Sequence, residues 1–70
     1  MKEIVKNKVA DLRKEKQITQ EDLAESVGVT RQTIIAIERG NYTPSVALAL
    51  KISKFFQKPL ENIFSVTYEK

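Results

Sequence analysis

The sequence predicts an all-α domain of five short helices in which residues 1–70 form one unit. Apolar residues recur at the three- and four-residue spacing of amphipathic helices, and glycine or proline stands at several breaks between these stretches. Ser, Thr or Asn precedes most of them as an N-cap. A chain this short holds a single small core, because it buries only about 60% of the surface that its unfolded form exposes.

Turn signals bound the first two predicted helices. The first helix begins near Asn7, a favourable N-cap, and ends around Lys16. Thr19 and Asp22 have the spacing of a capping box, in which each residue's side chain accepts a hydrogen bond from the other's backbone amide, and they open the second helix. Gly28 ends it, because glycine tolerates the positive φ of a C-terminal cap.

The third and fourth predicted helices are bounded in the same way. Thr30 caps the third helix, which covers Arg31–Arg39 and ends at Gly40. Ser45 follows a proline and begins the fourth helix. Residues 46–56 are apolar over so much of the helix circumference that this helix is expected at the centre of the domain.

The chain ends carry a different pattern. Pro59 starts a short fifth helix, Leu60–Ile63. Residues 64–70 begin with an alternation of apolar and polar residues that is typical of a strand, and Ile4 and Val5 can pair with them. Segments 1–6 and 64–70 are therefore expected as terminal strands of a small two-stranded antiparallel sheet, with a role in dimerisation.

Composition argues against several classes of function. The chain has no Cys and no His, which removes disulfides, nucleophile-plus-base catalytic pairs and most metal sites, so neither an enzyme nor a cofactor is expected. It has neither a membrane-length apolar stretch nor a signal-peptide core, which predicts a cytoplasmic protein with no membrane partner. The net charge of +3 is a mild indication of a polyanionic partner. A second copy of the chain is the expected source of additional stability.

The second and third helices together have helix-turn-helix spacing. Ala24 is small where the two helices must approach closely, and Gly28 supplies the bend. The apolar residues Val27, Ile34 and Ile37 fill the space that the two helices share. The small residue, the glycine and the apolar residues all stand at the spacing that this motif requires, which predicts a helix-turn-helix unit.

The outward face of the third helix has the side chains that read bases. At about 100° per residue, it holds Gln32 and Arg39, flanked by Ile35 and Ala36, with Arg31 at its leading end. Arg and Gln make paired hydrogen bonds to guanine and adenine edges, and apolar side chains contact the thymine methyl group. This face therefore suits the major groove of double-stranded DNA. For Ile35, an ordinary surface position is an equal alternative, since single exposed isoleucines are common.

The stretch ITQEDLAESVGVTRQTIIAIERGNYTPSVALALKISKFFQKPLENIF resembles the Cro and phage-repressor helix-turn-helix family, also called the Xre family, and covers most of the chain. The resemblance implies a five-helix DNA-binding domain that acts as a dimeric transcription regulator, of the short stand-alone type. It also implies an inward ion pair between Arg13 and Glu38, and a contact of Gln20 with a phosphate and a flanking base. Ala36 departs from relatives that carry a long polar residue there, which leaves the target sequence open.

The residues expected to contact DNA, from the outward face and the resemblance together, are Gln20, Thr30, Arg31, Gln32, Thr33, Ile35, Ala36, Arg39, Asn41 and Tyr42. Toward the C-terminus, the chain has more apolar residues than one small domain can bury, so some are expected at a two-fold interface. The candidate dimerisation residues are Phe56, Leu60, Ile63, Phe64, Val66 and Tyr68.

The sequence thus predicts a homodimeric transcription regulator that binds operator DNA by sequence, more often as a repressor. Two copies of the third helix would occupy successive major grooves about 34 Å apart. The alternative is an antitoxin or co-regulator that uses the same fold chiefly to hold a protein partner. Neither function requires a small-molecule ligand, and no pocket for one is evident in the sequence.

Overall fold

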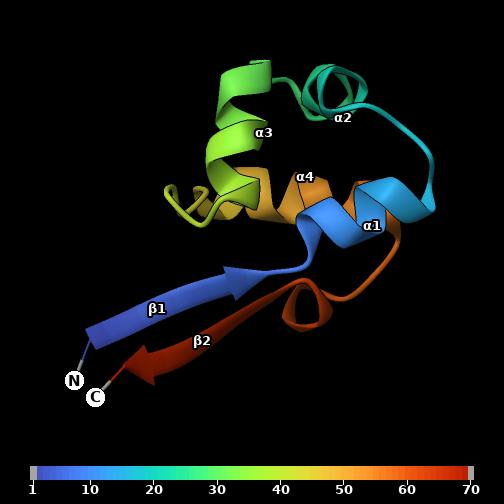
Figure 1. The fold of residues 1–70 in the computed structure, drawn as a ribbon. Coiled ribbons are helices and arrows are strands. Elements are labelled where there is room, and N and C mark those ends of the chain that lie inside the picture. Colours follow the sequence, from blue (N-terminus) through green and yellow to red (C-terminus); the bar gives the residue numbers. More distant parts are fainter. Residues whose placement is uncertain (1, 70) are drawn as a thin grey trace.

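The computed structural model describes residues 2–69 and is mostly helical (Figure 1). Its elements in chain order are β1 (Lys2–Asn7), α1 (Val9–Glu15), α2 (Gln20–Val27), α3 (Arg31–Glu38), α4 (Val46–Phe56), the 3-10 helix η1 (Leu60–Asn62) and β2 (Phe64–Glu69). Helices α2 and α3 lie at one end of the molecule, α1 and α4 lie across the middle, and the two strands extend from the other end (Figure 1). Within residues 2–69, no helix is long and apolar enough to span a bilayer.

Between residues 2 and 69 the chain has four α-helices, so the prediction of five was wrong. The segment after Pro59 makes a single 3-10 turn instead, in which the amides of Asn62 and Ile63 bond to carbonyls three residues back. Strand β2 begins at Phe64. Only a few residues therefore separate the proline from the strand, too few for the i to i+4 bonds of an α-helix.

The predicted caps of α2 and α3 are present. Thr19 Oγ1 accepts a hydrogen bond from Asp22 N at 3.0 Å, and Thr19 N donates to Asp22 Oδ2 at 3.1 Å, which completes the capping box. Gly28 ends α2 in the left-handed conformation with φ of 76°. Thr30 Oγ1 accepts from Thr33 N at the start of α3. These local signals place the turn between the two helices.

Asn7 links β1, α1 and α3. Its side-chain oxygen accepts a hydrogen bond from Val9 N at 3.1 Å, at the start of α1. Its amide nitrogen donates to the carbonyl of Ile37 at 2.9 Å, at the end of α3. The first helix thus begins two residues later than Asn7 itself, and the same side chain ties it to α3.

The core is formed by one set of buried apolar side chains from all four α-helices, together with Ile63 after η1. Its largest fully buried members are Val9, Leu23, Ile34, Ile37, Ile52 and Ile63. Helix α4 contributes more buried residues than any other helix, as predicted for the central one. One side of α4 is nevertheless open, since Val46 and Leu50 are exposed.

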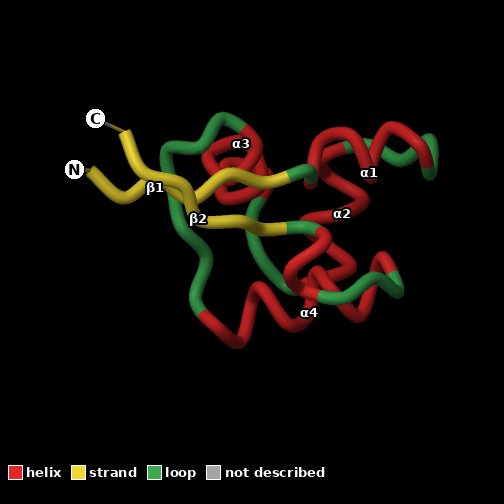
Figure 2. The backbone as a smooth tube through the Cα atoms, turned by 90° about the horizontal axis from the view of Figure 1, so that it is seen from below, coloured by secondary structure: helices red, strands yellow, loops and turns green. Residues whose placement is uncertain are grey.

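Strands β1 and β2 form an antiparallel ribbon from the two chain ends. Val5 lies opposite Val66, and Ile4 lies opposite Thr67. The pairing of the chain ends is therefore confirmed. The ribbon runs away from the helices, so that its outer half has no helix beside it in either view (Figures 1 and 2).

Candidate nucleic-acid interface

Helices α2 and α3 pack closely against each other. Leu23, Ala24 and Val27 of α2 are buried, and so are Ile34 and Ile37 of α3. The small side chain of Ala24 is 2% exposed, which is consistent with its predicted place at the close approach of the two helices. With its buried side fixed against α2, helix α3 presents its other side to solvent.

The exposed side of α3 carries polar and cationic groups. Arg31 and Gln32 are exposed at its first turn, and Arg39 is exposed at its end. Ile35 and Ala36 lie between them and are half-buried. Ile35, expected to be exposed on the flank of this face, therefore offers only part of its surface to a ligand.

Four more of the predicted contact residues lie toward the two ends of α3. Thr30 and Thr33 have their hydroxyl oxygens 3.2 Å apart, so these two side chains hold each other at the N-terminus. Gly40, with φ of 77°, turns the chain after the helix. Asn41 and Tyr42 follow this turn and are exposed. Apart from Gln20 of α2, the predicted positions therefore all lie between the cap of α3 and the loop beyond it.

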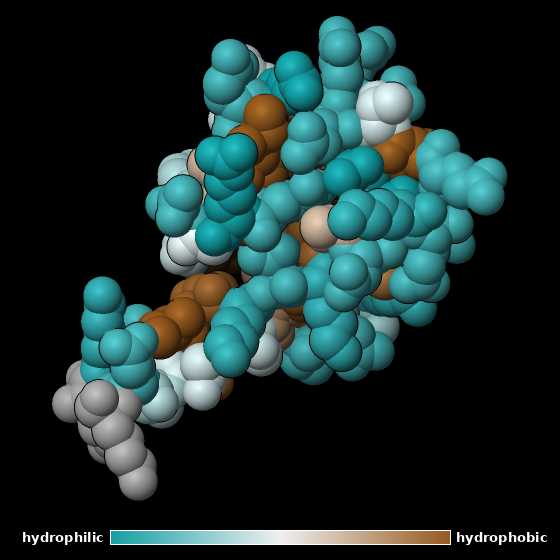
Figure 3. Space-filling model, in the orientation of Figure 1, coloured by the Kyte–Doolittle hydropathy of each residue, from teal (hydrophilic) through white to brown (hydrophobic). Residues whose placement is uncertain are grey.

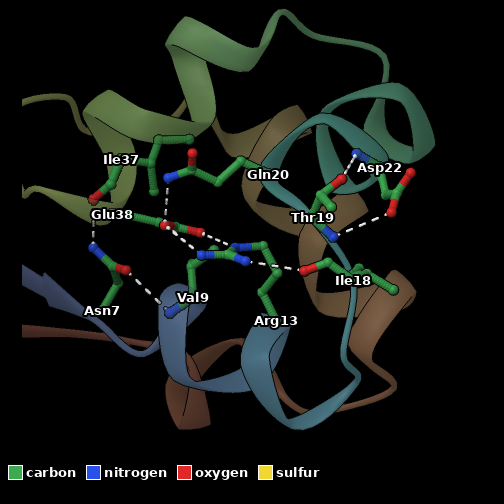
Figure 4. A network of polar contacts seen from close by, with 9 residues as sticks. All are labelled: Asn7, Val9, Arg13, Ile18, Thr19, Gln20, Asp22, Ile37 and Glu38. Atoms are coloured by element: carbon green, nitrogen blue, oxygen red, sulfur yellow. Dashed lines mark hydrogen bonds and ion pairs between the residues drawn. The ribbon is translucent and has the colours of Figure 1, made fainter.

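An ion pair joins α1 to the C-terminal end of α3 (Figure 4). Arg13 Nε donates to Glu38 Oε2 at 2.7 Å, and Arg13 Nη2 donates to Glu38 Oε1 at 3.2 Å. Arg13 Nη1 also donates to the carbonyl of Ile18 at 2.9 Å. The two side chains are only 13% and 8% exposed. This bidentate contact holds α1, the following turn and α3 together.

Gln20 belongs to the same cluster. Its Nε2 donates to Glu38 Oε1 at 3.0 Å, so a residue expected on the DNA surface also supports the ion pair. Burial alone would raise the pKa of Glu38, but the hydrogen bonds from Arg13 and Gln20 and the nearby positive charge lower it overall. The bond to Glu38 in turn raises the pKa of Arg13. Both groups are therefore held in their charged forms.

A shallow depression of about 400 Å³ lies beside this cluster. It is lined by Arg13, Thr19, Gln20, Glu21 and Arg31. The depression joins the N-terminal ends of α2 and α3, where free backbone amides favour anions. Sequence reasoning used Thr19 only as a helix cap and missed its place on this surface; its position as the N-cap next to Gln20 was the available signal.

The candidate dimerisation residues differ in how they are placed. Phe56 and Ile63 are 5% and 2% exposed and belong to the core of the single chain. Leu60 and Phe64 are half-buried, next to η1 and the ribbon. Val66 and Tyr68 are 54% and 59% exposed on β2. The exposed members of the set therefore gather on the ribbon.

This arrangement of two short helices, a glycine turn and an exposed second helix defines a helix-turn-helix domain. The family model HTH_3, described as helix-turn-helix, matches residues 9–63. The chain belongs to this family, which confirms the family resemblance seen in its sequence.

Named relatives come from archaea and bacteria. The chain is 57% identical over 60 residues to the uncharacterized HTH-type transcriptional regulator MJ0272 of Methanocaldococcus jannaschii, covering 86% of this chain and 91% of the relative. Identity to the uncharacterized HTH-type transcriptional regulator YgzD of Bacillus subtilis is 55%, with the same coverage of both chains. The cryptic phage CTXphi transcriptional repressor RstR of Vibrio cholerae is 34% identical over 59 residues, which cover 84% of this chain and 53% of that protein.

Solved structures share the fold. The restriction-modification controller protein C.AhdI from Aeromonas hydrophila matches with a TM-score of 0.73 and 27% identity, over 79% of this chain and 83% of that one. A putative DNA-binding protein from Bacteroides fragilis matches with a TM-score of 0.78 and 22% identity, over 89% of this chain and 100% of that one, and shows likeness of fold alone.

Proposed function

We propose that this protein is a transcription regulator that binds double-stranded DNA by sequence as a homodimer, with α3 in the major groove. The observation that carries the proposal is the exposed pair Arg31 and Gln32 at the first turn of α3. The only acidic residue of α3, Glu38, is paired with Arg13. The unpaired charges at the two ends of this helix are therefore positive, as contact with DNA requires.

The side chains of α3 suit direct readout of bases. The amide of Gln32 can donate to and accept from one adenine edge, and the guanidinium of Arg31 can bind a guanine edge or a phosphate. The half-exposed Ile35 and Ala36 add apolar surface for a thymine methyl group. Because Ala36 offers no hydrogen bond, recognition would rely on few polar base contacts.

Phosphate contacts would flank this readout on both sides. Gln20 and the depression beside it lie at the N-terminus of α2, which is positioned to meet the DNA backbone. Arg39, Asn41 and Tyr42 lie beyond the other end of α3 and are exposed. Such contacts set orientation and salt dependence, whereas those at Arg31 and Gln32 set sequence.

Dimerisation would present two copies of α3 to successive major grooves, about 34 Å apart. The exposed Val66 and Tyr68, with the half-buried Leu60 and Phe64, are the candidate contact surface. Repression by occupancy of the operator is the mode we propose, supported by the similarity to a phage transcriptional repressor. Phe56 and Ile63 would support this surface from the core without touching the partner.

The test is selection of bound duplexes from a random DNA pool, followed by affinity measurements at fixed salt on the selected site and on an unrelated duplex. Gln32→Ala and Arg31→Ala should each weaken specific binding by about 1–3 kcal/mol and leave the fold intact. Lys58→Ala is the matched control, because Lys58 is an exposed cation next to η1 and lines a depression with residues of β1, α1 and β2 and none of α3. It removes the same unit of charge as Arg31→Ala without touching the readout surface.

Two results would contradict the proposal. One is a wild-type protein that binds the selected and the unrelated duplex equally. The other is a Lys58→Ala variant that loses as much discrimination as Arg31→Ala, because the effect of Arg31 would then be no more than general electrostatics.

A further inference from the structure

The ribbon has two free edges. Apart from their pairing with each other, the backbones of β1 and β2 make no hydrogen bonds with any other element within residues 2–69. Two strands alone are marginally stable in water, and they need a third strand or a covering helix. Hydrophobic side chains gather on the ribbon where it leaves the helices (Figure 3). We therefore expect the ribbon to be stabilised by a further strand or by another element that covers it.

The two edges differ in charge. Strand β1 carries Lys2, Glu3 and Lys6, and charged residues, lysine above all, are the usual protection of an edge strand against pairing. Strand β2 has no charge from Phe64 to Tyr68. This uncharged run of aromatic and β-branched residues has high strand propensity. The edge of β2 is thus open to pairing, and that of β1 is not.

Strand β2 is also complementary to itself. In an antiparallel pair of two copies centred on Val66, each Phe64 lies opposite the partner's Tyr68, and each Ser65 lies opposite the partner's Thr67. Aromatic pairs and Ser-Thr pairs are both favourable across strands. The same operation centred on Ile4 of β1 would place Lys2 opposite the partner's Lys6, which is unfavourable.

We propose that β2 pairs with β2 of a second copy in this register, so that the two ribbons form one four-stranded antiparallel sheet in the order β1, β2, partner β2, partner β1. The proposal rests on the homodimer of the proposed function and names the surface that forms it. It extends the ribbon beyond two strands and covers the exposed Val66 and Tyr68.

A groove on the ribbon supports this register. It has a volume of about 440 Å³ and is lined by Val5, Leu60, Glu61, Phe64, Ser65 and Val66. Val5, Val66 and Phe64 belong to the ribbon face that also carries Tyr68, because opposed residues share a face and alternate along each strand. The partner's Tyr68, directly opposite Phe64, would lie on this same face and fill the groove.

Single cysteine substitutions test the register, because the natural chain contains no cysteine. Under mild oxidation Val66→Cys should form a disulfide-linked dimer of twice the 8.0 kDa chain mass. In the proposed register residue 66 lies opposite residue 66 of the partner, with a Cα–Cα distance of about 4.5–5.5 Å, which a disulfide can bridge. Leu50→Cys is the matched control, since Leu50 of α4 is 53% exposed and Val66 is 54% exposed. Failure of Val66→Cys to cross-link, or equal cross-linking of both variants, would overturn the proposal.

Lysine substitutions at the same two positions test the interface without covalent chemistry. In sedimentation without DNA, the wild type and Leu50→Lys should have the dimer mass, and Val66→Lys should have the monomer mass with unchanged helical circular dichroism. A dimeric Val66→Lys variant or a monomeric wild type would refute the interface. A wild-type dimer that binds its selected DNA site but fails the cysteine test would refute the β2 pairing and leave the proposed function standing. Cross-linking of Val66→Cys together with a wild type that does not recognise a DNA sequence would refute the proposed function and leave the β2 pairing standing.

Discussion

Replacing Glu38 by alanine should destabilise the domain by about 2–4 kcal/mol. The carboxylate accepts three hydrogen bonds, two from Arg13 and one from Gln20. Removing one partner of a buried ion pair costs about 3–5 kcal/mol, and the slight exposure of both side chains here lowers the estimate. In a domain of this size, which is stable by about 0.05–0.15 kcal/mol per residue, that loss is a large share of the total. The melting temperature should fall by at least about 8 °C.

A double-mutant cycle separates the ion pair from the other contacts of each residue. Urea unfolding, followed by circular dichroism, is measured for the wild type, Arg13→Ala, Glu38→Ala and the double variant. The bond from Arg13 to the carbonyl of Ile18 is lost with or without Glu38, so it cancels in the cycle. The two changes should be non-additive by about 1–3 kcal/mol, because the double variant should lose less free energy of unfolding than the two single variants lose together. Additivity within about 0.5 kcal/mol would refute the argument that this pair holds α1 to α3.

Three further predictions concern pH, backbone and salt. Because the pKa of Glu38 is lowered on folding, the contribution of its carboxylate to stability is present above the ordinary pKa of 4.5 and is lost as the pH falls through the pKa of the folded state. Glu38→Gln should therefore flatten the acid limb of a plot of unfolding free energy against pH. Gly28→Ala should cost about 1 kcal/mol in urea unfolding, since φ there is 76°, although no side chain or backbone beyond its chain neighbours lies within 4 Å of the added carbon. Gly28→Asn should cost less, and equal losses would contradict this reasoning. Arg39→Ala should reduce the slope of log affinity against log salt by about 1 while leaving the preferred sequence unchanged, and an altered preferred sequence would place Arg39 among the base contacts.

Local chemistry explains why most of the fold could be predicted. The caps at Thr19 and Thr30 and the turn at Gly28 depend on neighbours within a few residues, so their signals are present in the sequence itself. The prediction of a fifth α-helix was wrong because the strand that begins at Phe64 leaves too few residues after Pro59 for one. The sequence itself predicted this strand and its pairing with the N-terminal segment, so the short stretch between Pro59 and Phe64 already indicated that only a 3-10 turn fits there.

The sequence predicted which residues lie on the candidate site, but it predicted less well how far their side chains are exposed. Helical spacing alone put Arg31, Gln32 and Arg39 on the outer side of α3, where they lie. The same spacing could not show that Ile35 is half-buried, because neighbouring elements decide how much of a flanking position is covered. Nor could it show that Phe56 and Ile63 fill the core of the single chain, since a run of apolar residues reads alike in a core and in an interface.

Gln20 shows how the fold and the proposed DNA surface share one side chain. Its amide nitrogen has two hydrogens, and the bond to Glu38 uses one of them. The second hydrogen is free to reach a phosphate while the first still supports the ion pair. A contact made in this way needs no rearrangement of the cluster, so the ordering of Gln20 has been completed on folding and adds little entropic cost on binding. The ion pair between α1 and α3 therefore orients the proposed DNA surface as well as stabilising the fold.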